Sequence, residues 1–242
     1  QHFTLPMFTD VAPFDNVNVR LALKHAIDRK QLVEILLSGY GRVGNDSPIT
    51  PANRYFNSEM AQHAYDPDKA RYYLKQAGLD KLSVTLHAAN AAFPKAVDAA
   101  MLFSESATKA GIDLKVAREP DDGYWSNVWL KKPFCTCFWN GRPTEDLMFT
   151  TTYAADAPWN DSHWKNKRFN TLLIQARTEL DHDRRRSMYW EMQEIMRDDG
   201  GTIIPVYAQY VFASRSTLAH GPLASNRTLD GWKSMERWWH TG

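Results

Sequence analysis

Cysteine is scarce in this 242-residue chain, which contains only two, Cys135 and Cys137. On a strand, residues two apart point to the same face, so this pair is poorly placed for an unstrained disulfide. A Cys-x-Cys pair without further cysteines or a nearby histidine also lacks the ligands of a zinc site. We therefore predict that both cysteines are small buried residues that say little about the redox compartment.

Long apolar runs and clusters of basic residues are also missing. No stretch approaches the length needed to cross a bilayer, so the chain is predicted not to be membrane-spanning. The 29 lysines and arginines are balanced by 28 aspartates and glutamates, which leaves a net charge of +1. Because nucleic-acid binding needs clustered positive charge, no nucleic acid is expected as a partner.

The signatures of common catalytic and cofactor sites are absent as well. The eight histidines form no His-x-x-x-His pair, and there is no Gly-x-Ser-x-Gly elbow or phosphate-binding loop. Residues 39–44 match Gly-x-Gly-x-x-Gly, but a helical pattern precedes them, whereas a dinucleotide site needs a strand there. We expect no catalytic metal, no cofactor and no hydrolase activity, and the glycines should end a helix and shape a loop.

Short β-rich segments alternate with longer amphipathic ones, which is typical of an α/β protein. Strands are predicted at residues 82–89, 112–118, 133–140 and 202–207, and Pro205 suggests an edge or crossing position for the last. The helix between the first two strands implies a parallel crossover. The sheet is expected to be mixed or parallel and flanked by helices. Capping residues predict helices that begin near Asn16, Asp28, Asp66 and Gly123. Apolar spacing predicts a helix over residues 94–110 and marks two more by the apolar positions within residues 169–180 and 188–196.

The stretch over residues 134–146 carries the main candidate site. It begins as an aromatic, breaker-free strand and ends in a turn. The strand delivers Trp139, Asn140 and Arg142 to its carboxyl end, which is where open α/β sheets bind ligands. Residues 141–165 are predicted to form a long loop, and loops of that length in a compact domain tend to be functional.

Three motifs follow one another in a recognisable order. They are Pro13-Phe14-Asp15-Asn16 with the helix that runs to Arg29, Tyr65-Asp66-Pro67-Asp68-Lys69-Ala70 with Leu74 to Gly78, and Ile203-Ile204-Pro205-Val206-Tyr207. Together they resemble the second lobe of the family 5 solute-binding proteins, the oligopeptide-, dipeptide- and nickel-binding receptors of ABC importers. The resemblance implies a lobe of the type II periplasmic-binding-protein fold, not an enzyme.

The resemblance also implies a domain layout, because family members are much longer and bind ligand between two lobes that close by a hinge. Residues 1–14 would be an inter-lobe strand, 15–206 the second lobe, and 207–242 a crossover that returns to a missing first lobe. That last segment would pack poorly alone and expose three tryptophans, Trp232, Trp238 and Trp239. The implied partners are a small-molecule or peptide ligand, the importer permease and the missing N-terminal lobe. The implied location is periplasmic or extracellular, membrane-associated through the importer.

In peptide receptors of the family, the strand-end tryptophan is followed three positions later by an aspartate that holds the peptide α-amino group. The matching positions here are Trp139 and Arg142, so the aspartate is absent. A cation favours a carboxylate or phosphate over an ammonium group. The expected ligand is an anionic opine-like or sugar-phosphate-like solute, or a peptide if Glu145 or Asp146 supplies the acid. The predicted binding residues are Trp139, Asn140, Gly141, Arg142, Trp159 and Asn160.

Other hypotheses stay open on the sequence alone. The chain could be an enzyme of unrecognised type that uses Cys135 or an acid at Glu145 or Asp146, or it could be a structural interaction domain. Burial of Cys135 would weigh against the enzyme, and an aromatic-lined surface at Trp139 against the interaction domain. The alternative to ligand contact for Arg142 is that it braces its loop through one of the two acids.

Overall fold

Helices and strands alternate along the chain in the computed structural model, which describes residues 1–224 and 227–242. The strands are β1 (His2–Pro6), β2 (Gly41–Val43), β3 (Leu82–Ala88), β4 (Ile112–Arg118), β5 (Cys137–Trp139), β6 (Thr202–Ala208), β7 (Leu218–His220) and β8 (Trp238–His240). The helices are α1 (Val17–Ala26), α2 (Arg29–Leu36), α3 (Pro67–Gln76), α4 (Ala96–Thr108), α5 (Tyr124–Asn127), α6 (Glu145–Met148), the π-helix η1 (Phe149–Tyr153), α7 (Lys167–Thr178), α8 (His182–Asp199), α9 (Thr228–Trp232) and α10 (Ser234–Arg237). None of the helices in the described ranges is both long and apolar enough to cross a membrane.

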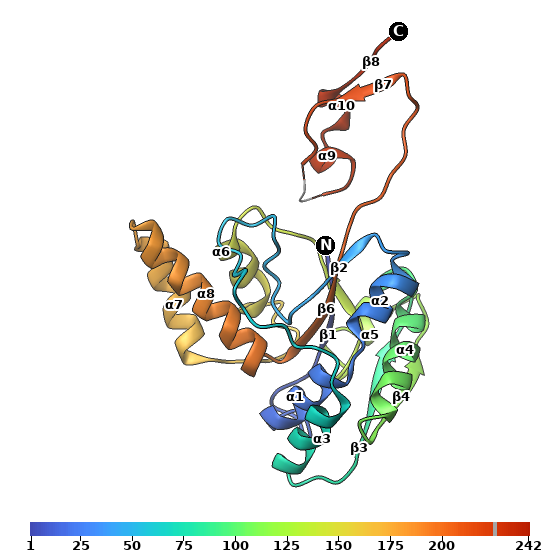
Figure 1. Ribbon diagram of the computed structural model, residues 1–242, viewed down its shortest axis with the longest axis vertical. Coiled ribbons are helices and arrows are strands. Elements are labelled where there is room, and N and C mark those ends of the chain that lie inside the picture. Colours follow the sequence, from blue (N-terminus) through green and yellow to red (C-terminus); the bar gives the residue numbers. More distant parts are fainter. Residues whose placement is uncertain (225–226) are drawn as a thin grey trace.

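An antiparallel sheet in the order β2-β6-β1-β5 lies at the centre of the molecule (Figure 1). β3 and β4 pair in parallel, as their connection through α4 predicts. His87 of β3 joins the two sheets, because its N–H donates to the carbonyl of Phe134 at 3.0 Å and its carbonyl accepts from the N–H of Thr136 at 2.9 Å. The predicted mixed sheet is therefore confirmed, and β3, β4 and β5 run in the same direction.

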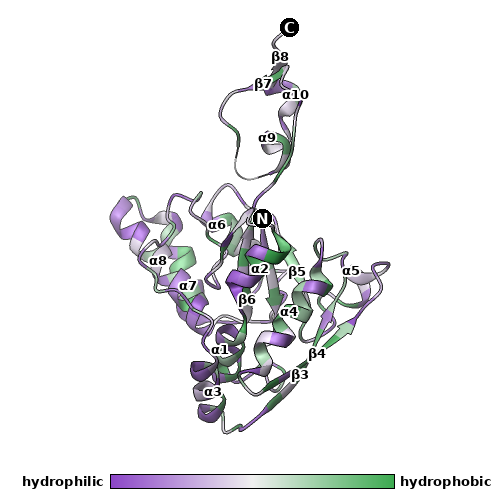
Figure 2. Cartoon of the chain, turned by 45° about the vertical axis from the view of Figure 1, so that its right-hand side comes forward, coloured by the Kyte–Doolittle hydropathy of each residue, from purple (hydrophilic) through white to green (hydrophobic). Residues whose placement is uncertain are grey.

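Helices cover both faces of this sheet. In β6, Ile203 and Val206 belong to the core formed with α1 to α4, whereas Ile204 and Tyr207 belong to the core formed with α6, η1, α7 and α8. Burying each such apolar side chain contributes about 1.5–3 kcal/mol. Figure 2 shows the matching pattern, with hydrophilic residues along α3, α7 and α8 and hydrophobic ones along the central strands.

Several helices begin where local capping predicted. The side chains of Asn16, Asp28 and Asp66 accept hydrogen bonds from backbone N–H groups of the following turn at 2.9–3.1 Å. These N–H groups have no acceptor within the helix, so each cap provides an acceptor for a donor that would otherwise be unpaired. Capping depends on residues that are close in sequence, which explains why these boundaries could be predicted.

Three local predictions need correction. Residues 133–140 do not form one strand, because Phe134 and Cys135 make isolated bridges to two different partners before β5 begins. Residues 141–165 are not one loop, because they contain α6, which Thr144 caps, and η1. Residues 1–14, predicted to be a strand, are extended only as far as Met7, which bridges to Phe134, and turns begin at Thr9.

Pro205 lies in β6, which is a central strand and not an edge strand. The register between β1 and β6 shifts between Phe3 and Leu5, opposite the proline. A bulge of this kind interrupts the ladder where proline has no N–H to donate. On its other side, the carbonyl of Pro205 accepts from the N–H of Gly44 at 2.8 Å. The edge prediction was wrong because β6 itself bulges at the proline, where Ile204 and Pro205 lie opposite the single residue Thr4 of β1.

Of the glycines over residues 39–44, Gly39 ends α2 as the sequence indicated, but Gly41 begins the strand β2 where a loop was predicted. Gly39 follows α2 with a φ of +79°, and Gly44 packs so tightly on β6 that a Cβ atom would lie 2.2 Å from the carbonyl oxygen of Ile204. We expect Gly44→Ala to lower the free energy of unfolding by about 1–3 kcal/mol in urea titration. The control is Gly221→Ala, because no atom lies within 4 Å of its added Cβ. Equal stability losses in both variants would contradict this.

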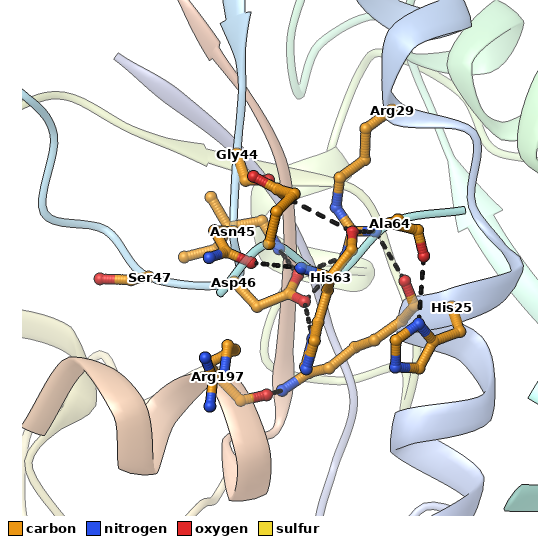
Figure 3. A network of polar contacts seen from close by, with 12 residues as sticks. His25, Arg29, Gly44, Asn45, Asp46, Ser47, His63, Ala64 and Arg197 are labelled. Carbon is orange, nitrogen blue, oxygen red and sulfur yellow. Dashed lines mark hydrogen bonds and ion pairs between the residues drawn. The ribbon is translucent and has the colours of Figure 1, made fainter. Parts of the chain in front are cut away.

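A buried polar network connects the segment after β2 to α2 and β6 (Figure 3). Arg29 donates to both carboxylate oxygens of Asp46, at 3.0 and 2.8 Å. His63 Nδ1 lies 3.1 Å from the same carboxylate, and the N–H of Ile204 donates to it at 2.9 Å. The side chains of Arg29 and Asp46 are 2% and 0% exposed, so this ion pair is shielded from water.

The chain leaves the sheet after Ala208 and forms a small unit of β7, β8, α9 and α10 at the top of Figure 1. Trp232 is 65% exposed and Trp239 is 53% exposed. Trp238 is half-buried against the rings of Phe212 and His220, whose centroids lie 5.2 and 5.1 Å away. Two of the three terminal tryptophans are thus exposed as predicted, and none belongs to the cores of the sheet.

Candidate ligand-binding site

Trp139, the last residue of β5, borders an aromatic hollow of ≈ 290 Å³. The pairing of His2 with Trp139 and of Phe3 with Phe138 holds this strand end against β1. Trp139 is buried, and its ring centroid lies 6.1 Å from that of Trp129 and 5.8 Å from that of Trp159. The residues that line the hollow are Trp125, Trp129, Cys137, Phe138, Trp139, Asn140, Arg142 and Trp159.

The topology explains why these residues meet. β4 and β5 run in the same direction, and the segments that follow them supply Trp125 from α5 and Asn140 and Arg142 from the turn after β5. The carboxyl ends of parallel strands lie at one edge, where α/β proteins bind ligands. β5 also pairs antiparallel with β1, so not all strands of the sheet have their carboxyl ends at this edge.

Asp161 lies beneath the aromatic wall and holds it. Its Oδ2 atom accepts from the indole N–H groups of Trp129 and Trp139, both at 3.2 Å. Asp161 is 2% exposed, and burial raises the pKa of this carboxyl to about 6, although the indole N–H groups act in the opposite direction. The carboxyl does not line the hollow, so it orients two walls without facing a ligand.

The guanidinium of Arg142 lies over the edge of the hollow. Its central carbon is 6.0 Å from the ring centroid of Trp139, and Nη1 donates to the carbonyl of Asn140 at 2.9 Å. Within residues 1–224 and 227–242, Arg142 forms no ion pair. Burial lowers the pKa of Arg142 from its usual value, with a smaller contribution from the charge of Arg227. Arg142 is therefore a cation without a carboxylate partner.

The two acids proposed to brace Arg142 have other partners. Glu145 is buried and accepts from the N–H of Tyr55 at 2.7 Å. Asp146 accepts from Nε of Arg177 at 2.7 Å. The bracing hypothesis is therefore wrong for these acids, and neither lines the hollow as an acid from a shifted loop would have to.

The sequence of this chain matches the family model described as Bacterial extracellular solute-binding proteins, family 5 Middle, over residues 1–161. The chain belongs to this family. Across 210 residues it is 29% identical to the dipeptide-binding protein of Escherichia coli K12, and the match covers 79% of this chain. The match covers 37% of the E. coli protein, so this family 5 chain spans well under half of that relative.

Solved structures agree on the fold. The periplasmic binding protein DppA of Helicobacter pylori, in complex with the peptide STSA, is 26% identical, with a TM-score of 0.77 over 86% of this chain and 41% of that one. The oligopeptide-binding protein AppA of Bacillus subtilis is 19% identical, with a TM-score of 0.79 over 100% of this chain and 51% of that one. The family 5 chain therefore has the type II periplasmic-binding-protein fold that its motifs predicted.

The other predicted binding residues of the family 5 chain are placed differently from one another. Trp159 is 46% exposed and lines the hollow. Asn140 also lines it, with Oδ1 accepting from the hydroxyl of Tyr210 at 2.7 Å. Gly141 is half-buried beside these residues but is not part of the lining. Asn160 is buried away from the hollow, where Nδ2 donates to the carbonyl of Trp164 at 2.7 Å.

The sequence did not point to Asp161, Trp125, Trp129 or Tyr210 as site residues. The spacing of four between Trp125 and Trp129 was the available signal, because it predicts one shared face of a helical turn. Nothing local marks Asp161, since its hydrogen-bond partners lie 22 and 32 residues before it.

Catalytic chemistry finds little support in the family 5 chain. Cys135 and Cys137 are free, and each is 1% exposed. Burial raises the pKa of both thiols well above the ordinary value, so neither supplies a thiolate nucleophile. In the two described ranges, no three His, Cys, Asp or Glu side chains gather in a way that could hold a metal ion. The family is one of solute-binding proteins.

Proposed function

We propose that the protein is the substrate-binding component of an ABC importer that captures an anionic solute and delivers it to the membrane permease. The observation that carries this proposal is the Arg142 guanidinium over Trp139, at the edge of an aromatic hollow that no carboxylate of the described residues lines. A guanidinium pairs with a carboxylate or phosphate in two-point geometry. The indoles offer the apolar or ring-shaped part of the solute a stacking surface.

We further propose that this chain supplies one wall of the binding cleft. Residues 1–14 would connect the lobes, 15–206 would form the second lobe, and 207–242 would return to a first lobe. The exposed rings of Trp232 and Trp239 support that assignment, because a partner surface would cover them. Closure of two lobes would remove water from Arg142 and strengthen its pairing with an anion. The protein would act outside the cytoplasmic membrane, held there by its importer.

A peptide is the second candidate ligand. The E. coli relative is named a dipeptide-binding protein, and the H. pylori structure contains the peptide STSA. No acid of residues 1–224 and 227–242 lines the hollow to hold a peptide α-amino group. A peptide would therefore place its carboxylate, not its amino group, at Arg142, and a free carboxyl terminus would be required.

The test compares ligand pairs that differ in one charge, using thermal shift and then calorimetry on the full-length protein. The pairs are dipeptides and their carboxyl-terminal amides, opines and their amides, and sugar phosphates and the free sugars. For the anionic member that binds, we expect Arg142→Gln to weaken affinity about tenfold or more, because one charge-assisted contact is lost.

The matched control is Arg186→Gln, because Arg186 lies over Trp190 at 5.6 Å in α8, outside the hollow. This variant should leave affinity unchanged. Equal binding of both members of every pair, or full affinity in the Arg142→Gln variant, would contradict the proposal. Binding of a peptide amide but not of the free acid would contradict both candidates.

A further inference from the structure

A second, larger cavity adjoins the aromatic hollow. It measures ≈ 520 Å³ and lies between the sheet and the terminal unit, and its walls include residues of β2 and β6 and Leu223, Ala224, Arg227 and Asp230. Tyr210 lines it and donates its hydroxyl to Asn140, which lines the aromatic hollow, at 2.7 Å. The two cavities therefore meet at this hydrogen bond.

Positive charge dominates the larger cavity. Arg42 and Arg227 line it, and in the described part of the chain neither forms an ion pair. Arg227 lies over the ring of Trp232, with 4.1 Å between its central carbon and the ring centroid. This repeats the arrangement of Arg142 over Trp139.

Among the described residues, Asp230 is the one acid that lines this cavity, and it already has partners. Asp230 accepts from Nη1 of Arg237 at 2.8 Å, from the N–H of Ala224 at 2.7 Å and from the indole of Trp238 at 3.2 Å. Its side chain is 1% exposed. Asp230 therefore binds other groups of the terminal unit and does not neutralise Arg42 or Arg227.

The positive charges at the two cavities also act on each other. The charge of Arg227 contributes to the lowered pKa of Arg142, which means that the two guanidinium groups repel each other. Repulsion between like charges opposes the approach of the terminal unit to the sheet. An anion between them would remove this cost and would be attracted by both.

We propose that Arg227, together with Arg42 of the same cavity, forms a second oxyanion subsite, so that the solute carries two oxyanionic groups, one at Arg142 and one at Arg227. This inference rests on the proposed function, since it extends the Arg142 site. The solute class is a small dicarboxylate or a phosphorylated acid. Its second group contacts the terminal unit, so binding links that unit to the sheet.

The experiment uses malonate, inorganic phosphate and acetate as probes at equal ionic strength and pH. The melting temperature of the full-length protein is measured in each, and the value in acetate is subtracted. We expect malonate or phosphate to exceed acetate by about 2 °C or more at a tenfold excess over its dissociation constant. A gain with malonate alone indicates a dicarboxylate, and a gain with phosphate alone indicates a phosphorylated solute.

The variants separate the two sites. Arg142→Gln and Arg227→Gln should each abolish the excess over acetate, and Arg186→Gln should keep it. Because the readout is a difference between anions, a lower basal melting temperature in a variant does not affect it. An excess lost in Arg142→Gln but retained in Arg227→Gln overturns the second subsite and leaves the proposed function standing. An excess retained in both, or absent from the unmodified protein, overturns this inference.

Discussion

Replacing Asp46 with asparagine is expected to lower the free energy of unfolding by about 3–5 kcal/mol, because it leaves the Arg29 guanidinium charged and uncompensated in the interior. Asparagine is the appropriate substitution because Asp46 has a φ of 56°, and asparagine tolerates the left-handed region. The backbone strain is then nearly unchanged, so the difference in the free energy of unfolding between the two proteins reports the effect of the lost charge. Urea unfolding of both proteins measures it.

An exposed ion pair is the matched control. Arg168 donates to both oxygens of Glu191, at 2.6 and 2.8 Å, and its side chain is 56% exposed. Glu191→Gln makes the same chemical change as Asp46→Asn but in water, so it should cost less than about 1 kcal/mol. If both variants lost the same stability, burial would not be what makes the Asp46 pair important.

The Asp46 effect should depend on pH with a definite sign. Arg29 and the hydrogen bond from His63 hold the pKa of Asp46 well below its ordinary value, although burial acts the other way. A depressed folded-state pKa adds stability that is present above the unfolded pKa and is lost as the pH falls through the folded value. The difference between the unmodified protein and Asp46→Asn should therefore shrink as the pH falls below about 4.

Asp161 should show the opposite pH dependence. Its folded-state pKa of about 6 lies above the ordinary value of 3.8, so the folded protein binds more protons between these values. Stability must then fall as the pH rises through this window, by about 3 kcal/mol for a shift of about two pKa units. Asp161→Asn keeps an acceptor for both indoles and cannot ionise, so its stability relative to the unmodified protein should rise by that amount.

Urea unfolding at several pH values between 3.5 and 7.5 provides the measurement. The neighbouring Cys137 and Tyr153 stay neutral across this range, because burial raises the pKa of each well above its ordinary value. The control is Asp122→Asn, at an exposed acid before α5, which should give a flat difference. A flat difference for Asp161→Asn as well would mean that the buried carboxyl titrates normally and that the aromatic wall rests on an ordinary aspartate.

Much of the fold followed from local sequence. The caps at Asn16, Asp28 and Asp66 and the alternation in β3 and β4 are interactions between near neighbours, and the structure has these elements where they were predicted. The parallel pairing of β3 with β4 also followed, because a helix connects them. The order of three motifs was enough to indicate the family.

The parts that failed depend on partners distant in sequence. Residues 133–140 were predicted to form one strand because aromatic residues, cysteines and a threonine follow Pro133 without a breaker. In the structure, Cys135 bridges to β3 and Phe134 bridges to the chain after β1. Pro205 was predicted to lie at an edge because it lacks a donor, but a bulge in β6 opposite β1 accommodates it in a central strand. Pairing register is a property of two strands, so one segment does not reveal it.

The sequence by itself determined that Trp139 and Arg142 lie close together, because Arg142 follows three positions after Trp139 at a strand end. Its resemblance to the family also indicated that Arg142 stands where peptide receptors have an aspartate. Only the tertiary structure decided what surrounds the pair. Folding brought Trp125, Trp129 and Asp161 to Trp139, and it assigned Glu145 and Asp146 to other donors. The physical reason is that a buried polar group must be paired, and packing, not spacing along the chain, chooses its partner.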